Sequence, residues 1–145
     1  MPKRQRRGAS ASQSGPPFLM VSNRNKETNG LGKKLASKPA FFECPSDKDP
    51  TRFSSWTEIK SDDFQKRLIG LAENFDQMPE DQNEAQQHVT LFVHGFNVEW
   101  QEAVKRYAQI KADLFDRSDL GVLILFTWPS NGRKLPLLPL RQDSW

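Results

Sequence analysis

Few side chains in this sequence have the chemistry of a nucleophile, a general base or a metal ligand. They are His88, His94, the single cysteine Cys44, and Ser130 in the segment TWPSNG. A serine or thiol attacks an acyl group efficiently only when an adjacent base activates it. Two imidazoles and one thiol are too few for a multi-histidine metal centre. We therefore expect no metal and no cofactor, and covalent chemistry would require a serine or thiol beside one of the two histidines.

His94 lies in the segment HVTLFVHGFNVEW, at the end of an apolar run. The β-branched and aromatic residues before it are typical of a strand, and their near-continuous apolar character favours burial on both faces of a parallel sheet. Gly95 permits a turn that most residues resist. Asn97 can cap a helix whose first turn contains Glu99 and Glu102, where carboxylates are favoured. The segment predicts a strand, a tight glycine turn and a helix start.

The elements that follow predict a β-α-β unit. Apolar residues recur every three or four positions between Trp100 and Leu114, which indicates an amphipathic helix over residues 98–115. The helix ends before Gly121, and residues 122–126, VLILF, are typical of a second buried strand. A strand, a helix and a strand at this spacing form a parallel crossover unit, so we expect an α/β fold with two parallel neighbouring strands.

The first half of the chain predicts a small antiparallel section and one helix. Residues 18–21 form a short apolar strand that stops at SNRNKETNG, where Asn29-Gly30 and Gly32 indicate loops. Two further antiparallel strands are expected at residues 40–44 and 53–57.

Beyond these strands the apolar period changes to that of a helix. We expect this helix over residues 63–74, with Asp62 and Gln65 resembling a capping box. Residues 78–87 have no periodicity and predict a polar connection.

The charge is unevenly distributed along the chain. The formal net charge is +3, but four basic residues and no acidic residue lie within residues 1–17. Removing these four from the 21 Lys and Arg leaves 17 against 18 Asp and Glu, a net charge of −1. We expect residues 1–17 to be a disordered leader, with a nucleic-acid arm as the less favoured alternative. No apolar run reaches the roughly 18 residues of a membrane span, so we expect a cytoplasmic protein without nucleic-acid or membrane partners.

FVHGFNVEWQEAVKRYAQI and LFTWPSNG together resemble a bacterial branch of the α/β-hydrolase superfamily, related to esterases and lipases. Upstream, MVSNRN is similar to the first strand of this branch, which ends in an Asn-Arg pair, so the resemblance extends over residues 19–137. It implies a partial α/β-hydrolase-type parallel sheet, with short antiparallel strands at its amino-terminal side. It also implies that the strand before His94 leads into an oxyanion loop, at the sheet edge where ligands bind in open parallel sheets.

The same resemblance implies roles for the residues of that loop. An oxyanion hole of this type takes one backbone N–H from this loop and another from the residue after the nucleophile. The first donor would be Phe96, with Gly95 allowing the backbone to approach. His94 would organise the loop through ring hydrogen bonds to nearby backbone and would not be the catalytic base. A satisfied buried histidine at a helix entry is the alternative for His94, and the two interpretations overlap.

The resemblance implies no role in the chemistry for Ser130. No G-x-S-x-G surrounds it and no spare histidine is available as its base, so a turn is favoured over a nucleophile. We therefore expect no catalytic residue among the candidates. The residues implied to line the crevice are Asn97, Trp128 and Ser130.

No G-x-S-x-G occurs anywhere in the sequence. Two interpretations follow, and whether the chain is an enzyme stays open between them. In the first, residues 18–137 are the partial domain of an α/β-hydrolase that acts on a small ester or acyl substrate only in a full-length form, and residues 138–145 are a divergent tail. In the second, the chain is a small interaction protein that binds a partner through its sheet edge or the apolar residues from Leu135 to Leu140. We favour the first, because a sheet that lacks its central strand is marginal alone.

Overall fold

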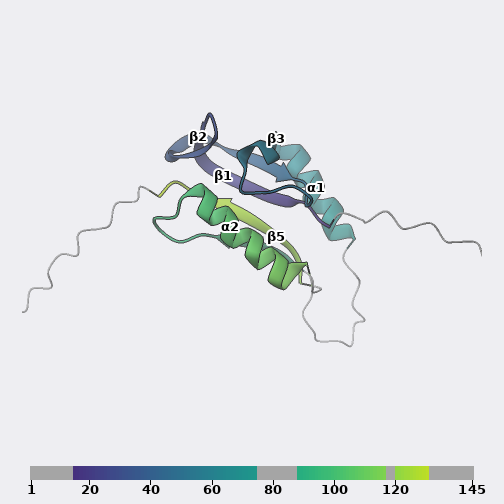
Figure 1. Ribbon diagram of the computed structural model, residues 1–145. Helices are drawn as coiled ribbons and strands as arrows, with labels where there is room; N and C mark the ends of the chain where they lie inside the picture. Colours follow the sequence, from purple (N-terminus) through teal and green to yellow (C-terminus); the bar gives the residue numbers. More distant parts are fainter. Residues whose placement is uncertain (1–14, 75–87, 117–119, 131–145) are drawn as a thin grey trace, which may run out of the picture.

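The computed structural model describes residues 15–74, 88–116 and 120–130, which form one five-stranded mixed sheet with a helix on each face. The strand order is β3-β2-β1-β5-β4 (Figure 1). The strands are β1 (Phe18–Glu27), β2 (Gly30–Cys44), β3 (Thr57–Ile59), β4 (His88–Val93) and β5 (Gly121–Thr127). β1, β2 and β3 pair antiparallel, whereas β5 pairs parallel with both β1 and β4. The predicted α/β class, the antiparallel section and the parallel pair are confirmed.

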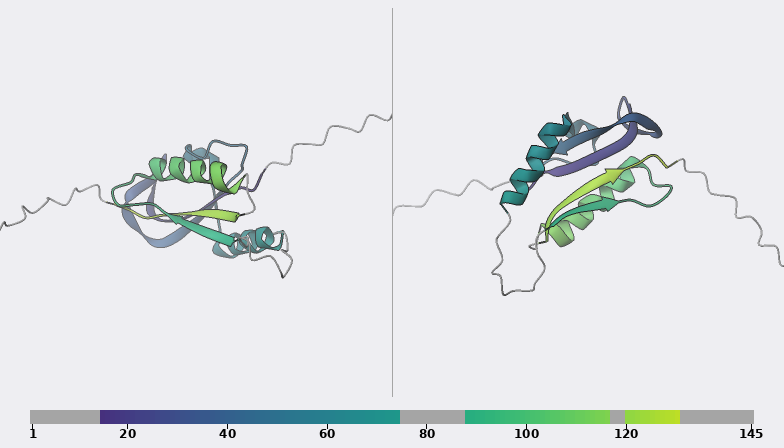
Figure 2. Two further views of the ribbon diagram at one scale, coloured as in Figure 1. Left: turned by 90° about the horizontal axis from the view of Figure 1, so that it is seen from below. Right: turned by 180° about the vertical axis from the view of Figure 1, so that it is seen from behind.

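Two helices cover opposite faces of the sheet, as both views of Figure 2 show. α2 (Trp100–Ile110) covers one face, where Ala103, Val104 and Tyr107 pack against alternate residues of the strands. α1 (Ser61–Glu73) covers the other face, where Phe64 is buried against Leu19, Val122 and Ile124. The two apolar clusters alternate along β5, because successive strand side chains point to opposite faces. Both helices were predicted; α2 begins two residues later than expected and continues into a π-helical turn, Lys111–Phe115.

The prediction that the strand at residues 88–93 is buried on both faces is wrong. β4 has the expected bounds, but it is the edge strand, and Val89, Leu91 and Val93 are 46–55 % exposed. These three side chains alternate onto the α1 face of the sheet, where Leu91 lies beside Ile124 in register. Burial of an apolar strand depends on what covers it, and β4 has a paired neighbour on one side only.

Several local predictions for the first half need correction. β1 runs to Glu27 instead of stopping near residue 21, because the polar residues after Val21 pair across a hairpin with β2. Gly32 lies inside β2 and not in a loop; a side chain there would lie 2.2 Å from Glu27 Oε1. The expected strand at residues 53–57 is a 3-10 helix, Phe53–Ser55, followed by β3.

The capping box predicted for the first helix is also wrong. Lys60 is the N-cap residue, and no side chain caps this end. The predicted connection at residues 78–87, the leader up to residue 14 and the segment after Ser130 lie outside the described residues. Within the described part of the chain, no helix is long and apolar enough to cross a bilayer.

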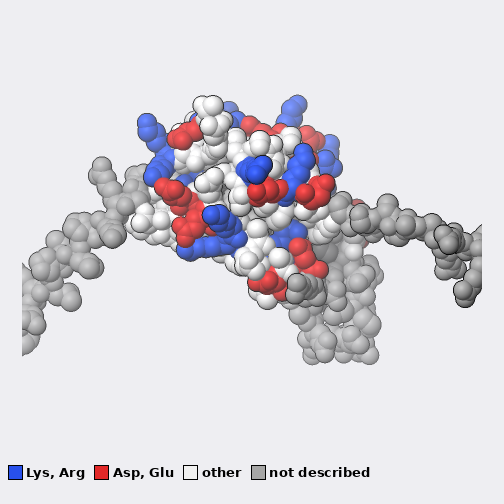
Figure 3. All heavy atoms as spheres, in the orientation of Figure 1, with Lys and Arg blue, Asp and Glu red and all other residues white. Residues whose placement is uncertain are grey.

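Charges of both signs are interspersed over the face seen in Figure 3. Several oppositely charged side chains of the described residues form exposed ion pairs, among them Arg67 with Glu43 and Lys33 with Glu99. Such exposed pairs contribute little stability, typically below about 1 kcal/mol each. The apolar clusters on the two faces of the sheet therefore hold the fold together.

Candidate functional site

The carboxyl ends of three parallel strands meet at one edge of the sheet. In register, Ser22 of β1 lies beside Thr127 of β5, and Val93 of β4 lies beside Phe126 of β5. The segments that leave these strands therefore begin close together. Such an edge is where open parallel sheets bind their ligands.

His94, directly after β4, is buried and fully engaged. Its ring nitrogen Nδ1 lies 2.8 Å from the carbonyl of Gly95, and Nε2 lies 3.2 Å from the backbone N–H of Trp128 and 3.0 Å from Thr127 Oγ1. Because the Trp128 N–H can only donate, Nε2 accepts, so the proton of the neutral ring is on Nδ1 and is donated to Gly95. The indole of Trp128 stacks on this ring with 5.7 Å between centroids and donates to the carbonyl of His94.

These contacts leave His94 poorly suited to act as a base. Burial lowers its pKa below the usual 6.5; the bond to the Gly95 carbonyl opposes this shift, and the nearby guanidinium of Arg24 adds to it. The lone pair on Nε2, which a base would use, already receives hydrogen bonds. The ring therefore ties the segment after β4 to the segment after β5.

Arg24, near the end of β1, is the largest fully buried side chain and joins four segments of the chain. Nε donates to Thr127 Oγ1 at 2.8 Å, and one terminal nitrogen donates to the carbonyl of Gly32 at 3.2 Å. The other donates to the carbonyl of Val98 at 2.6 Å and lies 3.4 Å from His94 Nε2. Burial lowers its pKa, and the carboxylate of Glu99 opposes that shift. The guanidinium is thus a buried cation held by neutral acceptors.

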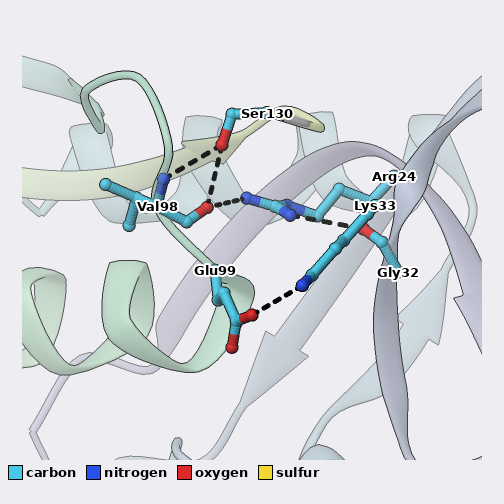
Figure 4. A network of polar contacts seen from close by, with 6 residues as sticks. All are labelled: Arg24, Gly32, Lys33, Val98, Glu99 and Ser130. Atoms are coloured by element: carbon cyan, nitrogen blue, oxygen red, sulfur yellow. Dashed lines mark hydrogen bonds and ion pairs between the residues drawn. The ribbon is translucent and has the colours of Figure 1, made fainter. Parts of the chain in front are cut away.

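Ser130 closes the same network from the other side, as Figure 4 shows. Its hydroxyl oxygen accepts from the Val98 N–H at 3.0 Å, and the hydroxyl lies 3.3 Å from the Val98 carbonyl, which also accepts from Arg24. The Ser130 side chain is buried, and both of these contacts are with the backbone of Val98. Ser130 has no histidine among its hydrogen-bond partners in the described residues. Its side chain therefore holds the backbone of Val98 in place and has no base beside it.

The loop between β4 and α2 has exposed residues between these fixed points. Phe96 is 57 % exposed, and its backbone N–H has no hydrogen-bond partner within the residues that the structure describes. Asn97 has φ of 63°, in the left-handed region that asparagine tolerates better than most residues. The strained backbone of this turn therefore lies at Asn97, and not at Gly95 as predicted.

The same geometry corrects the predicted helix cap. Glu99 is the N-cap residue of α2 and makes no side-chain capping bond. The left-handed Asn97 lies two residues earlier and is not the cap.

The remaining sequence candidates are far from this edge or inert. His88 is exposed at the opposite end of β4 from His94. Cys44 is fully buried, and burial raises the pKa of its thiol to about 11, so the reactive thiolate is disfavoured at neutral pH. The structure does bring together the six residues expected at the loop and the crevice: His94, Gly95, Phe96, Asn97, Trp128 and Ser130.

Arg24 and Thr127 complete the network, although the sequence did not single them out as site residues. One signal was available for Arg24: its position at the end of an apolar strand, in the Asn-Arg pair of MVSNRN. A charged residue whose neighbours in the sequence are buried is expected to serve binding or a specific polar network. Thr127 gave no such signal, since threonine is common in strands.

Comparison with known proteins relates the second half of the chain to one family. A family model described as "Alpha/beta hydrolase of unknown function (DUF900)" matches residues 72–138. The chain matches no curated protein and no solved structure. The matched region contains β4, α2, β5 and the loops after both strands, and it begins after β1, so the MVSNRN segment lies outside it. The mixed α/β sheet described above is consistent with part of an α/β-hydrolase fold.

Proposed function

We propose that residues 94–98 are the oxyanion loop of an α/β-hydrolase-type acyl-transfer site, with the Phe96 N–H as its first donor. One observation carries the proposal: the backbone N–H of Phe96, an exposed residue, has no partner in the described chain and lies on a turn held at the carboxyl edge of the sheet. Acyl transfer develops negative charge on a carbonyl oxygen, and the loss of one fixed donor typically costs 2.7 to 4 kcal/mol of transition-state stabilisation. Asn97, Trp128 and Ser130 line the crevice beside this donor.

The contacts around the loop support this role, because a donor contributes most when it does not need to reorganise. His94 fixes the start of the loop through Thr127 and Trp128, while Arg24 and Ser130 fix its end through Val98. The buried guanidinium of Arg24 also places positive charge next to the loop, in contact with His94 and the Val98 carbonyl and without a carboxylate in direct contact among the described residues. Both features favour a negative oxygen bound at the loop.

We further propose that these 145 residues by themselves do not hydrolyse esters. The sequence has no nucleophile motif, the hydroxyl of Ser130 is engaged with Val98, and the lone pair of His94 is engaged with Trp128. Loss of the triad in such enzymes lowers turnover by about a millionfold. The substrate of a form that supplies the nucleophile and histidine would be a small ester or acyl compound.

The proposed donor can be tested by binding, without turnover. The probe is the monoanion of methyl benzylphosphonate, whose tetrahedral oxygens resemble the charged intermediate, and two-dimensional amide NMR of the full chain follows the Phe96 resonance. We expect a saturable shift of the Phe96 amide. Asn97→Val should weaken binding, because a β-branched residue resists positive φ, whereas Asn97→Gly should retain it.

A phosphonate that leaves the Phe96 amide unmoved while the fold is intact would refute the oxyanion-loop role. The companion measurement is turnover of a short-chain activated ester by the wild-type chain and by Ser130→Ala. We expect both to be indistinguishable from buffer; saturable activity that disappears in the variant would show that Ser130 is a nucleophile.

A further inference from the structure

A second concavity, of about 620 Å³, lies beside the proposed loop. It is formed between the β1–β2 hairpin and the end of β5, and its walls include Leu35, Phe126 and Trp128. This size falls within the usual range of about 300–1,000 Å³ for small-molecule sites. Trp128 connects the concavity to the loop, because its ring stacks on His94 and lies 6.4 Å from the ring of Phe96.

Three large apolar side chains line this concavity. Leu35 is 72 % exposed, the most exposed large apolar side chain described, although it sits within a strand. Phe126 and Trp128 are half-buried and present the rest of the apolar surface. Contiguous exposed apolar surface of this kind on a soluble domain commonly marks a binding site.

The charged residues of the concavity are both cationic. Lys33 and Lys34 line it, and no carboxylate of a described residue does. Lys33 forms an ion pair with Glu99 at 2.8 Å, whereas the ammonium of Lys34 has no partner among the described residues. The backbone of Lys34 is nevertheless fixed, because its N–H donates to Asn25 Oδ1 at 2.9 Å. A free cation on ordered backbone therefore borders an apolar wall.

We infer that this concavity binds the far end of an acyl compound that carries a second, anionic group: an aliphatic half-ester with a free carboxylate. The ester end lies at the Phe96 N–H, the alkyl chain lies on Trp128, Phe126 and Leu35, and the carboxylate pairs with Lys34. The ester position rests on the proposed oxyanion loop, whereas the carboxylate position rests on Lys34 alone. An aliphatic chain with one charge matches the apolar wall and the single free cation.

The experiment compares two probes that differ at one end only, monomethyl suberate, which ends in a carboxylate, and dimethyl suberate, which ends there in a neutral methyl ester. Two-dimensional NMR of the full chain follows the Trp128 indole N–H and the backbone amides of Leu35 and Lys34. We expect the half-ester to shift these resonances saturably and to bind two- to fivefold more tightly than the diester, the range expected for one exposed ion pair. Added salt should reduce this preference.

Lys34→Gln should abolish the preference for the half-ester without altering the affinity for the diester. Lys38→Gln is the matched control, since Lys38 is exposed on the same strand but does not line the concavity, and it should keep the preference. Equal binding of the two probes, a preference that survives Lys34→Gln, or no binding by either probe would overturn the inference. The phosphonate titration of Phe96 reports separately on the oxyanion loop, so failure of one proposal is distinguishable from failure of the other.

Discussion

β4 and β5 are parallel neighbours with similar apolar sequences, HVTLFV and GVLILFT, yet their surroundings differ. Residues 122–125 of β5 are at most 6 % exposed, whereas Val89, Leu91 and Val93 of β4 are 46–55 % exposed. β5 lies between β1 and β4 with a helix on each face, while β4 is the edge strand. An apolar run therefore predicts parallel pairing, and its burial depends on neighbours that the run itself does not specify.

This difference in burial between the two strands does not extend to the residues at the carboxyl edge of the sheet. Thr127, the last residue of β5, is buried, and so is His94, which directly follows the exposed β4. Both contact the guanidinium of Arg24. The polar network thus anchors the end of β4, although the apolar side chains of that strand are half-exposed. Such an anchor fixes the loop that begins at the sheet edge.

The largest expected effect is a difference in stability loss between two leucine substitutions, one on each strand. Leu125→Ala on β5 should lower the free energy of unfolding by about 2–5 kcal/mol, because it opens a cavity in a fully buried position. Leu91→Ala on β4 should lower it by less than about 1 kcal/mol, since Leu91 is 55 % exposed. Urea denaturation of the full chain measures both. Equal losses would mean that the face of β4 that carries Leu91 is covered in solution.

Arg24→Met tests whether the network joins the ends of the two strands. The variant removes the guanidinium donors from Thr127 Oγ1 and from the carbonyls of Gly32 and Val98, of which Val98 keeps only the Ser130 hydroxyl among the described residues, so we expect a loss of about 2 kcal/mol. Arg67→Met is the control: its exposed ion pair with Glu43 should contribute less than about 1 kcal/mol. If both variants unfold at the same urea concentration, the buried contacts of Arg24 contribute no more to stability than the exposed ion pair does.

Much of the fold could be predicted from the sequence because its signals are local. The three- and four-residue apolar spacing located α1 and α2, and the two apolar runs located β4 and β5. The failures were nonlocal. The polar second half of β1 is held by pairing with β2, and the exposure of β4 follows from its place at the sheet edge; neither is encoded in the residues of the strand concerned.

The candidate site likewise has features that local sequence predicts and features that depend on contacts between distant segments. The strand-turn-helix pattern around His94 placed the loop correctly, and the segment after β5 lies against it through Trp128 and Ser130. The backbone strain was assigned to Gly95, the residue best suited to it, but the chain adopts positive φ at Asn97. The partners of Arg24 could not be predicted, because they come from three other segments that only the sheet register brings together.

The buried histidine that follows β4 predicts a pH dependence of stability. Burial lowers the pKa of His94, so the folded chain takes up its proton less readily than the unfolded chain, whose histidine titrates near pH 6.5. The unfolded state then binds more protons below that pH, and stability should fall as pH decreases from about 6.5, with a slope of at most about 1.4 kcal/mol per unit.

The measurement is the urea-derived free energy of unfolding between pH 7.5 and 5.5, where we expect this group to contribute a loss of about 1 kcal/mol. His94→Gln should flatten the profile over this interval. His88→Gln, at the exposed start of β4, is the matched control for replacing a histidine by glutamine on the same strand. An identical slope in His94→Gln would mean that the buried imidazole does not govern this pH range.

The smallest expected effect lies in the turn after β4, at Asn97. Its φ of 63° is disfavoured for residues with a Cβ, and asparagine tolerates it because its short side chain bonds locally. Asn97→Ala should therefore lower the free energy of unfolding by about 1 kcal/mol, whereas Asn97→Gly should change it by only a few tenths, since relief of strain offsets greater freedom in the unfolded chain. Urea denaturation gives both values, and the Phe96 amide resonance reports the loop itself. Because β4 lacks the cover that β5 has, the conformation of this turn depends on His94, Val98 and its own backbone preference. An alanine variant as stable as the glycine variant would show that the turn readily adopts another conformation, and the Phe96 N–H would then not be a fixed donor.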